Sequence, residues 1–168
     1  MKKIILMLFI TILVLVCACA NGVREKSTNS GSDVSKKGDV MLNISDLTGR
    51  EWKLIKVYIN GSDTQFTRSS LPSELGDCFT IKFDGQTVSG IGAPNRYSAP
   101  YTIGDNQTIS IMIMRSTLMA SLFEPENLKE YDYNNYVQNS HSWSIVDGQM
   151  ELHSKTADNR EVRLVFSL

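Results

Sequence analysis

Apolar side chains recur at every second position through most of the chain beyond Glu51. A two-residue period is typical of strands that bury one face, because successive side chains of a strand point to opposite faces of the sheet. The pattern predicts six strands, over residues 51–59, 79–84, 109–113, 142–145, 150–153 and 162–166. Two further short strands are expected over Thr87–Ile91 and Tyr97–Ile103.

Short turn motifs separate several of these segments. Asp84-Gly85, Asp147-Gly148 and the Gly-Asp-Asn sequence at 104–106 each lie between two expected strands. Glycine, asparagine and aspartate tolerate the positive φ of tight hairpin turns, so consecutive strands are expected to pair antiparallel. The polar stretch Asn60–Gly76 is interpreted as a long loop with one helical turn over Ser73–Leu75.

One late segment has a helical pattern instead. Alternation is lost over Glu124–Asn139, where Leu128, Tyr131 and Asn135 follow at spacings of three and four, and Pro125 is a favourable first helical residue. A single helix late in an antiparallel chain predicts a mostly β (α+β) fold. We expect a compact antiparallel barrel-like sheet of about eight strands with one helix late in the chain.

The N-terminus has the pattern of a secretion signal. Lys2 and Lys3 precede the apolar run Ile4–Val16, whose 13 residues are too few to span a bilayer. A small residue before a cysteine then resembles a bacterial lipobox. Cys19 follows a small alanine whereas Cys17 follows a bulky valine, so we expect cleavage before Cys19 and a diacylglycerol on its sulfur. Ordinary secretion without a lipid is the alternative.

These features divide the chain into three parts. Residues 1–18 are interpreted as the lipoprotein signal peptide, residues 19–43 as a lipidated flexible tether rich in Ser, Gly, Asn and Lys, and residues 44–168 as the folded domain. Asn21, rather than an aspartate, is the second residue after Cys19. The expected location is therefore the bacterial cell envelope, lipid-anchored in the outer membrane and facing the periplasm.

Composition and charge exclude several function classes. The 17 Lys and Arg residues balance 18 Asp and Glu residues without a basic run in the domain, which argues against nucleic-acid binding. The histidines, His141 and His153, are twelve residues apart, and no G-x-S-x-G or phosphate-loop motif is present. We therefore expect no enzyme activity, no metal and no cofactor. Cys78 opens an alternating segment and is interpreted as a small buried hydrophobe.

A series of short motifs carries a resemblance to a known family. In chain order these are Leu47–Leu54 (LTGREWKL), Phe79–Gly85 (FTIKFDG), Val88–Gly90, Asn95–Tyr97 with Tyr101, and Thr117–Ala120 (TLMA). Their order and spacing resemble the META domain family, which includes the HslJ-like bacterial envelope proteins. The resemblance covers residues 45–168 and implies a mostly antiparallel barrel-like sheet with a helix, and links to stress response and envelope phenotypes.

The resemblance also implies structural roles for the residues in these motifs, namely Trp52, Gly90, Asn95, Tyr97, Tyr101 and Thr117. Glycine allows a close backbone approach, asparagine can bond the backbone of a nearby turn, and tyrosine can bury its ring with the hydroxyl at the rim. The chain departs from the family at Pro94 and Ser121, where members often carry cysteines. Any disulfide or thiol chemistry of those cysteines is absent.

The remaining candidate for a function is a group of tyrosines. Tyr131, Tyr133 and Tyr136 lie within six residues and are a possible contact surface for another protein. The first hypothesis is thus a non-enzymatic envelope lipoprotein that supports envelope integrity or stress tolerance through protein contacts. The alternatives are a barrel that encloses a small molecule or lipid, and a hydrolase inhibitor that acts through the loop Asn60–Gly76.

Overall fold

The computed structural model describes residues 43–120 and 125–168, with the side chains of 63–65 excepted. Cys17, Cys19, the expected signal peptide and all but the last residue of the expected tether lie outside the described residues. Asp39–Leu168 forms one compact unit. No helix in the described ranges has the length and apolar character needed to cross a membrane.

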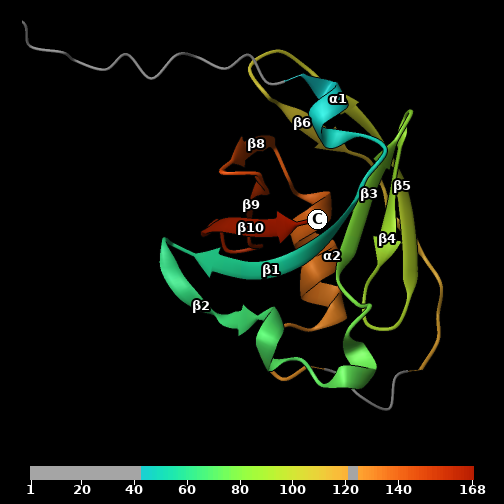
Figure 1. Cartoon of the computed structure of the whole chain (residues 1–168), viewed down its shortest axis with the longest axis vertical. Helices are drawn as coiled ribbons and strands as arrows, with labels where there is room; N and C mark the ends of the chain where they lie inside the picture. The colour runs from blue at the N-terminus through green and yellow to red at the C-terminus, as the bar shows by residue number, and fades with distance from the viewer. Residues whose placement is uncertain (1–42, 121–124) are drawn as a thin grey trace, which may run out of the picture. The chain divides into compact units, whose positions relative to one another are not determined.

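The described part of the chain contains one antiparallel sheet of ten strands (Figure 1). The strands are β1 (Glu51–Ile59), β2 (Ser62–Thr67), β3 (Thr80–Asp84), β4 (Thr87–Ile91), β5 (Arg96–Ile103), β6 (Ile109–Ile111), β7 (Arg115–Ser116), β8 (Ser142–Val146), β9 (Gln149–Lys155) and β10 (Glu161–Ser167). Eight of them follow the order β6-β5-β4-β3-β1-β10-β9-β8, while β2 pairs with β1 and β7 pairs with β5. Each strand segment expected from the alternation is present.

The two ends of this strand order meet. The backbone N–H of Ile109 donates to the carbonyl of His141 at 3.0 Å, and the N–H of Trp143 donates to the carbonyl of Gln107 at 3.0 Å. Thr108 and Ser142 form an isolated antiparallel bridge between these bonds. The sheet is therefore a nearly closed barrel, which confirms the predicted fold class, and closure leaves few backbone groups unpaired at its edges.

Two α-helices and two 3₁₀ turns accompany the strands in the described residues: α1 (Ile44–Leu47), α2 (Glu130–Gln138), η1 (Arg68–Ser70) and η2 (Ser73–Leu75). The late helix is confirmed, but its predicted start at Pro125 is wrong. Residues 126–128 form a turn and a bend instead, and Leu128 is buried in the core. The helix therefore begins at Glu130. The short helix α1 was not predicted, although Asn43 and Asp46 form a reciprocal capping box.

The segment between β1 and β3 is more ordered than a long loop. Asn60 and Gly61 both have positive φ, 53° and 75°, and form a hairpin turn from β1 into β2. Phe66 on β2 is buried, so the strand contributes to the core. The predicted turn over Ser73–Leu75 is present as η2.

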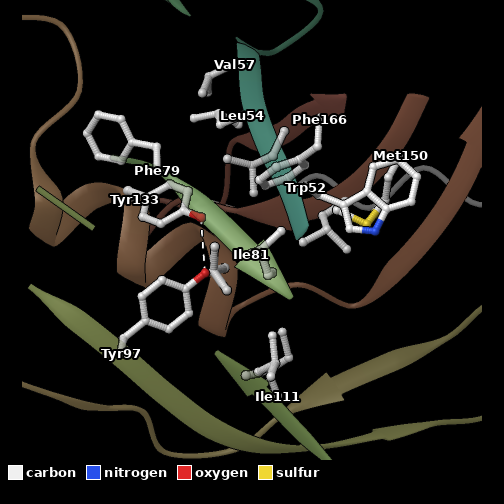
Figure 2. Close-up of a cluster of buried hydrophobic side chains, with 14 of the residues drawn as sticks. Trp52, Leu54, Val57, Phe79, Ile81, Tyr97, Ile111, Tyr133, Met150 and Phe166 are labelled. Atoms are coloured by element: carbon white, nitrogen blue, oxygen red, sulfur yellow. Dashed lines mark hydrogen bonds between the residues drawn. The ribbon is translucent and has the colours of Figure 1, made fainter. Parts of the chain in front are cut away.

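The barrel interior is filled with side chains (Figure 2). Five large residues from five different strands or connections, Trp52, Phe79, Ile81, Ile111 and Trp143, are all buried in one cluster. Phe79 has a positive φ of 55° and packs edge-on against Phe66, with ring centroids 5.4 Å apart. Cys78 beside it is also buried, as predicted.

Candidate functional site

Three polar side chains from distant parts of the chain meet at one corner of the barrel. Glu130, the first residue of α2, accepts bonds at Oε1 from the backbone N–H groups of Ala93 and Asn95, at 2.8 and 2.6 Å. Its Oε2 accepts from Asn95 Nδ2 at 2.7 Å. Thr117 Oγ1 donates to Asn95 Oδ1 at 2.8 Å. We call Asn95, Thr117 and Glu130 the polar corner.

Asn95 uses its whole amide group in this corner. Beyond Thr117 and Glu130, its Oδ1 accepts from the backbone N–H of Met119 at 2.6 Å, and its Nδ2 donates to the Met119 carbonyl at 3.3 Å. The expectation that Asn95 bonds the backbone of a nearby turn is thus corrected, because Met119 lies 24 positions along the chain. Gly92 leaves the space for Glu130, since a Cβ there would overlap the carboxylate.

A pair of buried tyrosines, Tyr97 and Tyr133, connects β5 to α2 in the core (Figure 2). The hydroxyls of Tyr97 on β5 and Tyr133 on α2 lie 3.1 Å apart, and both approach the carbonyl oxygen of Thr80, at 2.8 and 2.9 Å. Two hydroxyl protons serve three contacts, so at most two of the contacts are hydrogen bonds at any moment. The Tyr97 hydroxyl therefore lies in the core rather than at the rim.

Burial dominates the ionisation of this pair. Desolvation raises the pKa of Tyr97 well above the ordinary value, and the neighbouring Tyr133 adds to the shift. Desolvation also raises the pKa of Tyr133 above the ordinary value. Both phenols are consequently neutral hydrogen-bond donors and are not poised to act as bases at neutral pH.

The other residues implied by the family resemblance also lie in or against the core. Gly90 on β4 is pressed against Thr80, and a Cβ there would overlap both the Thr80 carbonyl and the Tyr97 hydroxyl. Trp52 Nε1 donates to the carbonyl of Leu47 at 3.1 Å. Tyr101 buries its ring against Phe83, with centroids 5.1 Å apart. All of these contacts stabilise the barrel.

The three tyrosines of α2 do not form one surface. Tyr133 is fully buried and packs against Phe79 at a ring distance of 5.0 Å, so it cannot form a contact surface with the other two. The helical turn places positions 131 and 133 on different faces. Tyr131 is exposed, with 74% of its surface accessible, and Tyr136 is half-buried.

Arg68 is a further structural residue that the sequence did not indicate. Its guanidinium donates to the carbonyls of Leu54, Gly76 and Cys78 at 2.6–2.7 Å, and to that of Phe79 at 3.1 Å. Burial lowers the pKa of Arg68 from its usual high value. The side chain fastens η1 to the irregular backbone around Phe79, so the stretch Asn60–Gly76 is held against the barrel.

The described residues contain no group of three His, Cys, Asp or Glu side chains that could hold a metal ion. His153 faces Glu151, with Nε2 3.8 Å from Oε2, and burial lowers the pKa of His153 below its ordinary value. Ser144 Oγ lies 3.5 Å from His153 Nε2, the same ring nitrogen that faces Glu151, whereas in a Ser-His-acid triad the acid bonds the other ring nitrogen.

One surface segment is unusually apolar. Eight large hydrophobic side chains are exposed in the described residues. Four of them belong to one stretch of eight residues, namely Met112, Ile113, Leu118 and Met119, whereas the other four are scattered along the chain, namely Ile44, Tyr131, Val146 and Leu168. Leu118 is 99% exposed and Ile113 is 83% exposed. We call Met112–Met119 the apolar segment. It runs beside β5, held there by the short strand β7 (Figure 1).

Surface clefts flank this segment and the helix. One, of about 530 Å³, lies between Pro100 on β5 and Met112, Ile113 and Arg115 of the apolar segment. A second, of about 310 Å³, lies between α2 and the turn that joins β9 to β10, and it includes Tyr131 and Tyr136. None of the five large core residues named above lines either cleft.

Comparison with known proteins identifies the domain and its fold. The family model of the META domain matches residues 45–166. No curated protein matches the chain.

Two solved structures are similar. An NMR structure of a protein from Burkholderia xenovorans is 20% identical with a TM-score of 0.52, covering 72% of this chain and 83% of that one. A crystal structure of a DUF4847 family protein from Bacteroides vulgatus is 10% identical with a TM-score of 0.50, covering 70% and 92%. At these identities the two structures share the fold alone.

Proposed function

The chain belongs to the META domain family, and from that premise we propose that it is a non-enzymatic lipoprotein of the bacterial envelope that acts through protein contacts. Its domain is held at the outer membrane, facing the periplasm, by a lipid on Cys19, and it supports envelope integrity or stress tolerance. The HslJ-like envelope proteins belong to the same domain group.

The apolar segment carries this proposal. Soluble domains rarely expose neighbouring large apolar side chains, and those that do commonly use them to bind a partner. Ile113 and Leu118 project from irregular backbone on either side of β7, where a partner surface can reach them. Between Gln86 and Ala120 the only charged side chains are Arg96, Asp105 and Arg115, so little desolvation opposes a contact.

The alternative functions have less support. A ligand inside the barrel would have to displace the cluster that contains Trp52, Phe79 and Ile81, and such displacement is costly because protein interiors are close-packed. An inhibitory loop over Asn60–Gly76 is disfavoured since β2 pairs with β1 and Arg68 binds four backbone carbonyls.

Photo-crosslinking in cells tests the contact. A photoreactive amino acid at Ile113 or Leu118 of the full-length lipoprotein should give a discrete crosslinked protein. The same residue at Val146, which is exposed in the β8–β9 turn, is the matched control and should give none. Absence of a crosslink at both positions of the apolar segment, or the same products at all three positions, contradicts the proposed contact.

The anchor has a separate test. Replacing Cys19 by Ala should move the protein from the membrane to the soluble fraction, because a diacylglycerol supplies most of the attachment to the bilayer. Cys17→Ala is the control and should leave the protein membrane-bound. Continued membrane residence of C19A together with release of C17A would assign the lipid to the other cysteine.

A further inference from the structure

The cleft beside α2 is separate from the apolar segment, with which it shares no lining residue. One wall is a face of the helix, where Tyr131, Asn135 and Asn139 follow at intervals of four and Asp132 and Tyr136 lie next to them. The other wall is the turn 155–160 between β9 and β10. The volume of about 310 Å³ is at the lower end for small-molecule sites, so the cleft can hold one small ligand or one residue of a polymer.

The wall formed by the turn is ordered by its own side chains. Thr156 Oγ1 donates to Asp158 Oδ1 at 2.5 Å, and Arg160 Nε donates to Asp158 Oδ2 at 2.8 Å. The backbone N–H of Arg160 donates to Thr156 Oγ1 at 2.9 Å. A pre-ordered wall reduces the conformational entropy that a ligand must otherwise offset on binding.

The charges of the cleft are mixed and largely paired. Arg160 is paired with Asp158, and Lys155 Nζ lies 3.2 Å from Glu161 Oε1. Asp132 forms no ion pair within the described part of the chain. A phosphate would have to compete with Asp158 and Glu161 for the two cations. An ammonium group would be repelled by the positive charges of Arg160 and Lys155.

A hydroxyl group suits such walls better than either ion does. It donates to a carboxylate and accepts from a guanidinium or amide N–H, so one ligand type can satisfy Asp132, Asn135 and Arg160 together. Tyr131 adds an exposed aromatic ring, on which an apolar C–H face can pack. Tyr136 stays a neutral donor because burial raises the pKa of its phenol, and Asp132 adds to this.

Sugars combine these two properties, since a pyranose ring carries hydroxyls around its rim and C–H groups on its faces. We propose that the cleft between α2 and the β9–β10 turn binds one uncharged sugar unit of a glycan, stacked on Tyr131 and hydrogen-bonded by Asp132, Asn135 and Arg160. A site of this kind would add glycan binding to the contact made by the apolar segment.

Calorimetric titration of the full-length lipoprotein, kept in a detergent without a sugar headgroup, tests this assignment. The probes are an oligomer of N-acetylglucosamine, an oligomer of glucose, inorganic phosphate and ethanolamine. At least one of the two oligosaccharides should bind saturably, and neither charged probe should displace it. Tyr131→Ala and Asn135→Ala should each weaken the binding by about tenfold or more, which corresponds to about 1.4 kcal/mol.

Matched variants separate binding from folding. Tyr131→Phe keeps the ring and should retain most of the affinity, while Val146→Ala, at the end of β8 and not among the residues that line the cleft, should leave it unchanged. Thermal unfolding should be the same for the two Tyr131 variants as for the unsubstituted protein, because Tyr131 is exposed. Failure of both oligosaccharides to bind, affinity that survives in Y131A and N135A, or displacement by phosphate or ethanolamine overturns the proposal, whatever the crosslinking result at Ile113.

Discussion

Thr117 and Leu118 are neighbours in the chain, yet their side chains make different contacts. Thr117 donates to Asn95 within the polar corner, whereas Leu118 is almost completely exposed on the apolar segment. The motif that resembles the family contains both residues. A family pattern can therefore combine positions that hold the barrel together with positions that are exposed on the surface, and only their surroundings distinguish them.

The two regions should respond differently to substitution. Removing a group from the polar corner or the tyrosine pair leaves buried donors and acceptors without partners, which costs free energy of unfolding. Removing the side chain of Ile113 or Leu118 uncovers little that was buried, so the free energy of unfolding should hardly change.

Gly90→Ala should have the largest effect. The new Cβ would overlap the backbone carbonyl of Thr80 and the Tyr97 hydroxyl, and neither a backbone group of a paired strand nor a buried ring can move away freely. We expect a loss of about 3 kcal/mol or more of unfolding free energy, or no folded protein. Chemical denaturation measures this, with Gly148→Ala in the β8–β9 turn as a comparison: its Cβ would meet no atom within 4 Å, but its φ of 77° should still cost about 1–2 kcal/mol through backbone strain. A loss below about 1 kcal/mol would contradict the close packing at Gly90.

Glu130→Ala should be the next most destabilising. It removes the acceptors of two backbone N–H groups and of Asn95 Nδ2. Bonds to a charged group contribute more than neutral ones, so we expect a loss of about 3 kcal/mol. Glu130→Gln keeps one acceptor oxygen and should lose less. Equal losses for both variants would show that the helix, rather than the hydrogen bonds, responds to the substitution.

Alkaline pH should weaken the same region. The pKa values of Tyr97 and Tyr133 are raised by burial, so the folded state keeps both protons at a pH where the unfolded chain releases them. Stability is thus fully present below about pH 10, the pKa of an unfolded tyrosine, and falls as pH rises above it. The expected slope is about 1.4 kcal/mol per pH unit for each tyrosine. Urea denaturation between pH 8 and 11.5 measures the slope, and Tyr133→Phe should reduce it by about half.

Leu118→Ser should have the smallest effect on stability. The side chain is almost fully exposed, so its replacement should change the unfolding free energy by less than about 0.5 kcal/mol. The crosslink from a photoreactive residue at Ile113 should nevertheless be weakened in this variant. A large loss of stability would show that Leu118 packs against the domain and would remove the apolar segment as a contact surface.

Parts of the fold that we did not predict could have been inferred from local sequence signals, whereas the key residue of the polar corner could not. Asn60-Gly61 is a strong hairpin signal, and weighing it would have predicted β2 within the segment interpreted as a loop. The capping box at Asn43 would have predicted α1 in the same way. Glu130 gave no such signal, because its role depends on Ala93 and Asn95, which lie 37 and 35 positions earlier in the chain.

The pattern of apolar and polar positions by itself determined that the chain forms an antiparallel sheet with a late helix. A strand alternates its faces through backbone geometry alone, so the period of two is visible without any knowledge of what the strand packs against. The tertiary structure alone decided that Tyr133 turns inward to Tyr97 while Tyr131 lines an open cleft, and that the Thr117 hydroxyl bonds to Asn95 while the Leu118 side chain is almost fully exposed. Those outcomes depend on contacts between residues distant in the chain, which form only when the barrel closes around its core.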